Sequence, residues 1–255
     1  MPKEVPCPPR VPARRILEVL AQIYPDVGSG LNFSNPFQCL VATMLSAQCT
    51  DRVVNQVTPA LFAKMPDAPT LAAAEPAVVE PLIRHVGLYH TKAKNLVAAA
   101  RLLCEHHGGE VPARMEDLLA LPGVGRKTAN VVLANAFGLP GLAVDTHVLR
   151  VSNRLGLASS RSPEVVERQL KRRVPRAEWG REHHRLIWHG RLVCHARNPE
   201  CPACPLLPLC RWGKAYVKTQ SAGGGAAPPP GTRPGGAAAR RDGIRQVRAP
   251  FDVKS

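Results

Sequence analysis

The sequence predicts an all-α protein. Apolar residues recur at helical spacing in nearly every segment before the C-terminal tail, and no segment shows the alternating apolar and polar residues of a half-buried strand. No internal repeat is present. Proline and glycine divide the chain into short lengths, with breaks at Pro36, Pro59, Pro66, Pro76, Gly87, Pro112, Pro122, residues 138–141 and Pro175. Together these observations favour a bundle of short helices.

Residues 92–103 carry the clearest periodicity. Their charged side chains, Lys92, Lys94 and Arg101, lie largely opposite an apolar face. That face consists of Ala93, Leu96, Val97, Ala100 and Leu103. A surface helix with one buried side is therefore expected here.

A second helix is expected from Ser162 onward. Ser162 supplies an N-cap hydroxyl, Pro163 suits the first turn, and Glu164 complements the positive end of the helix dipole. An apolar stripe then continues through Val165, Leu170 and Val174.

The composition is strongly basic, with 34 Lys and Arg against 19 Asp and Glu and a formal net charge of +15. Because such an excess repels itself unless a polyanion screens it, nucleic acid or an anionic membrane surface is the expected partner. A basic surface that only maintains solubility is the alternative. No apolar run reaches the length of about 18 residues that would span a bilayer, so no membrane insertion is expected.

The N-terminal residues are rich in proline and lack the apolar core of a secretory signal. A reducing, cytoplasmic location is therefore expected, in a bacterium close to the nucleoid. The eight cysteines are accordingly interpreted as thiols or metal ligands before disulfides.

The composition changes sharply near Lys214. Residues 221–239 consist almost entirely of Ser, Ala, Gly, Pro and Thr, which cannot bury enough apolar surface to fold. Residues 214–255 carry eight Lys or Arg against two Asp, a net charge of +6. The sequence predicts a disordered basic arm from 214 to 255, which adds non-specific affinity for phosphate at most.

A glycine-rich turn is expected between helices at residues 115–121 and 125–136. Gly123 and Gly125 allow the backbone to turn sharply and bring bare N–H groups close to an anion. The following helix adds its own unpaired N–H groups, and Arg126 adds a positive charge. A DNA phosphate fits that concavity; an ordinary glycine-containing turn is the alternative.

Lys127 follows in the first turn of the second helix. An ammonium group is disfavoured at the positive end of the helix dipole, which favours the free amine that nucleophilic attack requires. A plain phosphate contact is the alternative role. Asp145 begins the next expected helix and can either cap it or face Lys127 across the helix pair; the two roles are compatible.

Four cysteines near the end of the folded part have the spacing C-x6-C-x2-C-x5-C. They are Cys194, Cys201, Cys204 and Cys210. Four thiolates in a short loop can hold either a tetrahedral zinc ion or an iron–sulfur cluster, and the spacing alone does not choose between them.

The stretch LPGVGRKTANVV at 121–132, followed by VDTH at 144–147, resembles the helix-hairpin-helix and glycine/proline-rich loop with aspartate of the endonuclease III family of DNA glycosylases. The resemblance implies that Lys127 is the nucleophile and Asp145 the essential carboxylate. It also implies that the cysteine loop holds a [4Fe–4S] cluster. His147 is expected to help shape the pocket.

Two further segments resemble that family. LSAQCTD at 45–51 matches a segment whose Gln, here Gln48, fills the hole left by a flipped base. VGLY at 86–89 matches a loop whose Leu, here Leu88, wedges beside the orphan base. The resemblance extends over residues 14–212, with the motifs in family order.

The implied architecture has two domains with the active site between them. A six-helix barrel with the hairpin spans 36–147, and an iron–sulfur cluster domain combines 14–35 with 148–213. Residues 1–13 are expected to form a flexible N-terminus and 214–255 the basic tail.

The expected function is that of a monomeric, bifunctional DNA glycosylase and AP lyase of base excision repair. It would act on double-stranded DNA with a damaged base or abasic site, removing oxidised pyrimidines. An adenine-mismatch glycosylase shares these motifs but typically lacks the Lys and carries a further folded domain. A glycosylase for mismatched thymine or pyrimidine dimers stays open, as does a non-catalytic DNA-binding module.

Overall fold

The computed structural model describes residues 13–221, which form twelve α-helices and two short 3₁₀ helices and contain no strand. The all-α prediction is therefore confirmed for this part of the chain. Residues 1–12 and 222–255 lie outside the described residues, and so do most of the expected N-terminal segment and most of the expected basic arm. No helix within 13–221 has the length and apolar character that crossing a membrane requires.

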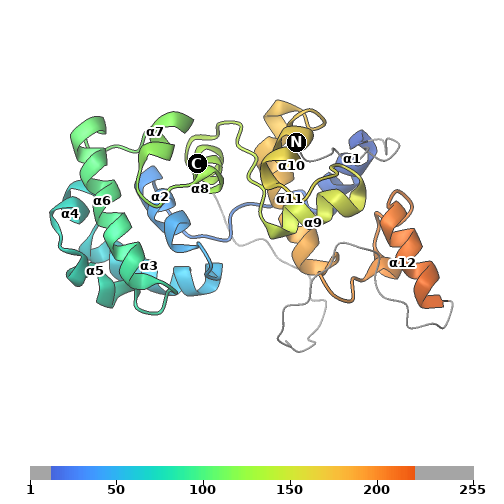
Figure 1. The fold of residues 1–255 in the computed structure, drawn as a ribbon, viewed down its shortest axis with the longest axis horizontal. Helices are drawn as coiled ribbons and strands as arrows, with labels where there is room; N and C mark the ends of the chain where they lie inside the picture. The colour runs from blue at the N-terminus through green and yellow to red at the C-terminus, as the bar shows by residue number, and fades with distance from the viewer. Residues whose placement is uncertain (1–12, 222–255) are drawn as a thin grey trace.

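The helices form two lobes (Figure 1). The first lobe comprises α2 (Pro36–Leu45), α3 (Asp51–Lys64), α4 (Ala68–Ala73), α5 (Pro76–Ile83), α6 (Tyr89–His107), α7 (Met115–Ala120) and α8 (Arg126–Phe137). Its apolar core draws on residues from Phe37 to Leu133. The longest helix, α6, packs against α4 and α5.

The second lobe combines the first helix with the last ones (Figure 1). It contains α1 (Ala13–Ile23), α9 (Thr146–Leu155), α10 (Pro163–Lys171), η1 (Arg176–Glu178), α11 (Trp179–Leu192), η2 (Cys201–Ala203) and α12 (Arg211–Ser221). Its core joins Ile16, Leu20 and Tyr24 to residues from Leu142 to Cys210. The chain therefore leaves this lobe after α1, builds the first lobe, and returns at α9 to complete the core of the second. The domain boundaries at 36 and 147 stay predictions.

The two strongest helix predictions are confirmed. All five apolar residues expected on one face of α6 are buried, and Ser162 caps α10 by accepting a hydrogen bond from the Val165 N–H. One detail was wrong. Lys92, expected on the solvent side of α6, is buried at 8% exposure, because its ammonium group finds backbone carbonyls to bind.

The expected start of the tail at Lys214 was also wrong, because α12 continues to Ser221. The helix is held by aromatic packing that composition does not reveal. Trp212 stacks on Tyr216 with ring centroids 5.2 Å apart, and the Arg154 guanidinium lies 3.9 Å from the Trp212 ring centre. The stacking lies within α12, and the Arg154 contact fastens that helix to α9.

Polar contacts join the lobes at several points. Arg191 of α11 pairs with Asp51 at the start of α3 at 3.0 Å. His184 of α11 lies 2.9 Å from the side-chain oxygen of Asn135 on α8. Helix α11 of the second lobe is therefore hydrogen-bonded to both α3 and α8 of the first, and these bonds hold together the elements that carry the predicted site.

Candidate functional site at the junction of the two lobes

The hairpin before Lys127 has the expected helix–turn–helix form, between α7 and α8. Gly123 has φ +78°, and a Cβ there would lie 2.9 Å from the Asn95 side chain, so this position requires glycine. Gly125 is the N-cap of α8 and has no side-chain cap, and a Cβ there would meet nothing within 4 Å. The N-terminus of α8 is therefore open to an approaching anion.

Lys127 lies exposed in the first turn of α8. Within residues 13–221 its side chain has no hydrogen bond or ion pair. An amine that is bound to no neighbouring carboxylate is available to an incoming electrophile. The geometry is compatible with the predicted nucleophile and equally with a phosphate contact.

Asp145 is the N-cap of α9, as the sequence predicted. Its Oδ1 accepts a hydrogen bond of 2.8 Å from the Val148 N–H, and the residue is half-buried. The cap fixes the carboxylate at the edge of the second lobe through Oδ1, and Oδ2 accepts no hydrogen bond from the residues that the structure describes. One oxygen thus anchors the side chain while the other stays available for chemistry.

His183 on α11 relates the two predicted catalytic residues, and the sequence analysis missed it. The imidazole is 2% exposed, and its Nδ1 lies 2.7 Å from the Ala143 carbonyl oxygen, which can only accept a hydrogen bond. Burial lowers the pKa of His183; the charge of Asp145 and the Ala143 carbonyl oppose this, while Lys127 adds to it. The charges of Lys127 and Asp145 therefore both act on this one buried ring.

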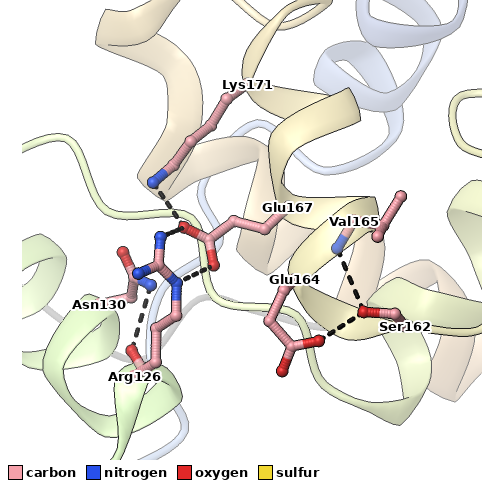
Figure 2. Close-up of polar contacts among 7 residues, drawn as sticks. All are labelled: Arg126, Asn130, Ser162, Glu164, Val165, Glu167 and Lys171. Carbon is pink, nitrogen blue, oxygen red and sulfur yellow. Dashed lines mark hydrogen bonds and ion pairs between the residues drawn. The ribbon is translucent and has the colours of Figure 1, made fainter. Parts of the chain in front are cut away.

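Arg126, the predicted phosphate contact, is engaged across the junction (Figure 2). Its Nε and Nη2 donate to the two oxygens of Glu167 on α10 at 2.8 and 3.0 Å, and Lys171 donates to the same carboxylate at 2.6 Å. Burial alone would raise the pKa of Glu167, but the hydrogen bonds and charges of the two cations outweigh it and lower the pKa. The structure thus gives Arg126 a bridging role; its phosphate contact stays a prediction.

His147 lies beside the junction, in the first turn of α9. Burial lowers its pKa, which the nearby Asp145 charge partly opposes, and its Nδ1 is 3.1 Å from Nη2 of Arg150. A Cβ on Gly190 would lie 3.0 Å from the His147 side chain, so α11 packs tightly against it. The ring is held in place, and its predicted role in the pocket stays a prediction.

Gln48 and Leu88, the predicted base-extruding residues, have unusual backbones. Both lie in the left-handed region, with φ of 54° and 61°. Leu88 is 63% exposed, and Gln48 is exposed as well. Because non-glycine residues rarely adopt this conformation and leucine side chains are rarely so exposed, a functional use is favoured over packing. The two loops adjoin, since a Cβ on Gly87 would lie 3.9 Å from the Gln48 carbonyl oxygen.

The four cysteines of the predicted metal loop line a single small cavity beside α9 and α12. The rest of its wall is mainly apolar, from Leu155, Val193, Pro199, Leu207 and Trp212. Within residues 13–221 no three His, Cys, Asp or Glu side chains group as ligands of one metal ion. All four cysteines thus lie in the wall of one cavity, but their side chains are not grouped there as the ligands of a single metal ion, so the metal site stays a prediction.

The surroundings of these sulfurs suit bound thiolates. The Gly213 N–H lies 3.2 Å from the sulfur of Cys210, and Nη1 of Arg154 lies 3.5 Å from that of Cys194. Burial raises the pKa of Cys201 to about 11, and the other three cysteines add to the rise. Four crowded thiols need cations to ionise them, and N–H donors to sulfur are typical around iron–sulfur clusters. The residues present fit such a group.

Comparisons with known proteins point to a single family. Residues 41–176 match the model of the HhH-GPD superfamily base excision DNA repair proteins. Endonuclease III of Synechocystis sp. is 51% identical over 199 residues, which cover 78% of this chain and 91% of that protein. Endonuclease III of Escherichia coli strain K12 is 48% identical over 201 residues, covering 77% of this chain and 93% of that protein.

The fold is similar to a solved structure of a trapped covalent intermediate between endonuclease III and DNA, an estranged-adenine complex. The two chains are 47% identical and superpose with a TM-score of 0.77, covering 80% of this chain and 96% of the other.

Proposed function

The chain belongs to the endonuclease III family of HhH-GPD base excision DNA repair proteins and is a DNA glycosylase with AP lyase activity, and we propose that it removes oxidised pyrimidines through a covalent intermediate at Lys127. The observation that carries this proposal is the exposed, unpaired amine of Lys127 on one lobe. It lies near the same buried histidine as the anchored carboxylate of Asp145 on the other.

The proposed reaction begins when the uncharged amine of Lys127 attacks C1′ of a flipped nucleotide. The bond between C1′ and the base breaks, and the base leaves with the electron pair and gains a proton. The lysine nitrogen then loses a proton, and the C1′–O4′ bond opens as O4′ gains one, so that C1′ and the nitrogen form a protonated Schiff base. This Schiff base acidifies the hydrogens on C2′, and loss of one of them expels the 3′ phosphate. Hydrolysis then frees the lysine, leaving a 3′ unsaturated aldehyde and a 5′ phosphate.

Asp145 is proposed to assist by accepting a proton from Lys127 or by stabilising positive charge as the base departs. The His183 ring is hydrogen-bonded to the Ala143 carbonyl, two residues before Asp145. Because this buried ring stays neutral, it adds no positive charge beside the amine.

Cys194, Cys201, Cys204 and Cys210 are proposed to hold a [4Fe–4S] cluster, as expected for this family. When bound, the cluster would join the loop to α9 and α12 as a structural support, and the amine chemistry needs no electron from it. Iron and sulfide analysis of the purified protein tests this proposal, because a zinc site would contain neither element.

DNA recognition is proposed to combine the open N-terminus of α8 with Gln48 and Leu88. Gly123 and Gly125 let a phosphate approach the backbone, while Gln48 fills the hole left by the flipped base and Leu88 wedges beside the orphan base. We also propose that the protein acts as a monomer.

A strand-cleavage assay with chelator present tests the proposed chemistry. A duplex with one thymine glycol should be cut to the 3′ unsaturated aldehyde and 5′ phosphate in EDTA, and the same duplex with thymine should stay intact. Base release without cleavage, or cleavage that needs a divalent cation, would contradict the lyase mechanism. Efficient release of mismatched thymine or splitting at a pyrimidine dimer, without action on thymine glycol, would favour the alternative specificities.

A further inference from the structure

Lys92 carries a buried ammonium group that the proposed chemistry does not use. Its Nζ donates to the backbone carbonyls of Leu45 at 2.8 Å and Ala47 at 2.6 Å. These carbonyls lie at the C-terminal end of α2, where a helix dipole favours a positive charge. Burial lowers the pKa of Lys92. The ammonium group therefore exchanges water for backbone carbonyls at the start of the loop between α2 and α3, here called the Gln48 loop.

The backbone of the same residue binds the other loop. The Lys92 N–H donates to the Leu88 carbonyl at 3.0 Å, which closes the first turn of α6. The Gln48 loop and the Leu88 loop are 40 residues apart in sequence, yet both are hydrogen-bonded to this one residue. Lys92 thus fixes the spacing between the two loops.

Both loops need such support. A left-handed backbone is strained for a residue other than glycine, and it persists only where the surroundings hold it. Gln48 and Leu88 each carry this strain and are both exposed, so their own side chains contribute little packing. The bonds from Lys92 reach Ala47, directly before Gln48, and Leu88 itself.

We propose that Lys92 is a positioning residue that holds Gln48 and Leu88 as one rigid wedge, so that the two enter the duplex together and extrude the target base. The inference rests on the proposed function, in which these two side chains replace the flipped base. Lys92 touches neither the DNA nor the reacting atoms and acts only through the two loops.

Replacing the lysine by methionine tests the proposal, since Lys92→Met keeps the length of the side chain and removes the ammonium donor. Single-turnover base release from a duplex with a paired thymine glycol should fall by about 10- to 100-fold, as expected when a positioning contact is lost. Cleavage at a ready-made abasic site should fall far less, because no base must be unstacked there. The fluorescence of 2-aminopurine opposite the lesion reports extrusion and should rise more slowly.

Lys94→Met is the matched control. Lys94 is exposed on the same helix, so this change removes the same charge without an anchor and should leave both rates within about twofold of the wild type. Thermal unfolding measured in parallel detects a general loss of structure. If Lys92→Met does not fold, Lys92→Arg replaces it; the arginine keeps the charge but not the fit, so base release should again fall more than abasic cleavage.

A double-mutant cycle with Gln48→Ala gives the decisive readout, because the ammonium group that Lys92→Met removes is bound to the loop that carries Gln48. If Lys92 acts by positioning Gln48, adding Lys92→Met to Gln48→Ala should lower base release far less than it does alone. Independent, multiplying effects would overturn the inference, as would equal loss of base release and abasic cleavage. Failure of the proposed function would instead appear in the wild-type protein, as absence of base release and of abasic cleavage.

Discussion

Lys127 and Asp145 are held by different lobes, and each is fixed by its own helix terminus. The lysine stands in the first turn of α8, and the aspartate caps α9 with one oxygen. This arrangement separates the structural task of Asp145 from its proposed chemical one. Because asparagine caps a helix about as well as aspartate, a substitution can remove the charge and keep the cap.

Asp145→Asn should therefore lower single-turnover base release by about 10²- to 10⁴-fold, the range for a lost acid–base group, with little change in thermal stability. Asp145→Ala should lose the same activity and also about 1 kcal/mol of stability, because the bond from Val148 goes with the cap. Calorimetry and rapid-quench assays on a thymine-glycol duplex measure the two effects. Unchanged base release in Asp145→Asn would show that the carboxylate is not needed.

At the scale of elements, the ion-pair bridge ties α8, which carries Lys127, to α10 in the other lobe (Figure 2). The Glu167 side chain is 5% exposed, whereas that of Arg126 is 51% exposed. The buried carboxylate needs its two cations to compensate for lost hydration. The half-exposed arginine, in contrast, would be hydrated by water if the pair were broken. The bridge is therefore worth less than a fully buried pair.

Glu167→Gln should lower the free energy of unfolding at pH 7 by about 1–2 kcal/mol, less than the 3–5 kcal/mol of a fully buried pair. The pKa of Glu167 is lowered from its ordinary value of 4.5, so its contribution is complete above that pH and is lost as the pH falls through the folded-state pKa. Urea unfolding between pH 7 and pH 3 should show the difference from wild type shrinking below about pH 4.5.

Glu105→Gln is the control for this series, because Glu105 lies exposed on α6, away from the bridge, and should change stability by less than about 0.5 kcal/mol. A difference between Glu167→Gln and the wild type that grows on acidification would contradict the assignment of the bridge.

Local signals explain which parts of the fold and site were predictable. The caps and turns around α8, α9 and α10 involve residues at most four apart, so Gly123, Asp145 and Ser162 are readable from sequence. The pairing of Arg126 with Glu167 spans 41 residues, and that of Lys92 with Leu45 spans 47. No periodicity encodes such contacts.

His183 was missed for a related reason. It stands on a helix beside a second histidine, and nothing in that pattern tells that one ring lies near Lys127 and Asp145. Only the packing of α11 against α8 and α9 decides it.

At the scale of the whole molecule, the excess of positive charge should affect how tightly the protein binds DNA more than how fast it cleaves the bound DNA. Of the net +15, residues 222–255 contribute six Lys or Arg against two Asp. Each phosphate contact changes the slope of log affinity against log salt by about 0.9 for duplex DNA.

A chain that ends at Ser221 should therefore bind undamaged duplex more weakly, with a salt dependence shallower by up to about 4 units of slope, while cleavage at saturating DNA stays the same. Fluorescence anisotropy from 50 to 200 mM salt measures the slope. An equal slope in both chains would mean that residues 222–255 contact no phosphate.

Covalent trapping tests the central claim most directly. Borohydride added during turnover of an oligonucleotide with one abasic site should reduce the Schiff base and leave the DNA attached to the protein, and peptide mapping should locate the adduct at Lys127. Lys127→Ala should form no adduct, whereas Lys92→Met and Glu167→Gln should still form it. An adduct that survives Lys127→Ala, or its absence from the wild-type protein, would contradict Lys127 as the nucleophile.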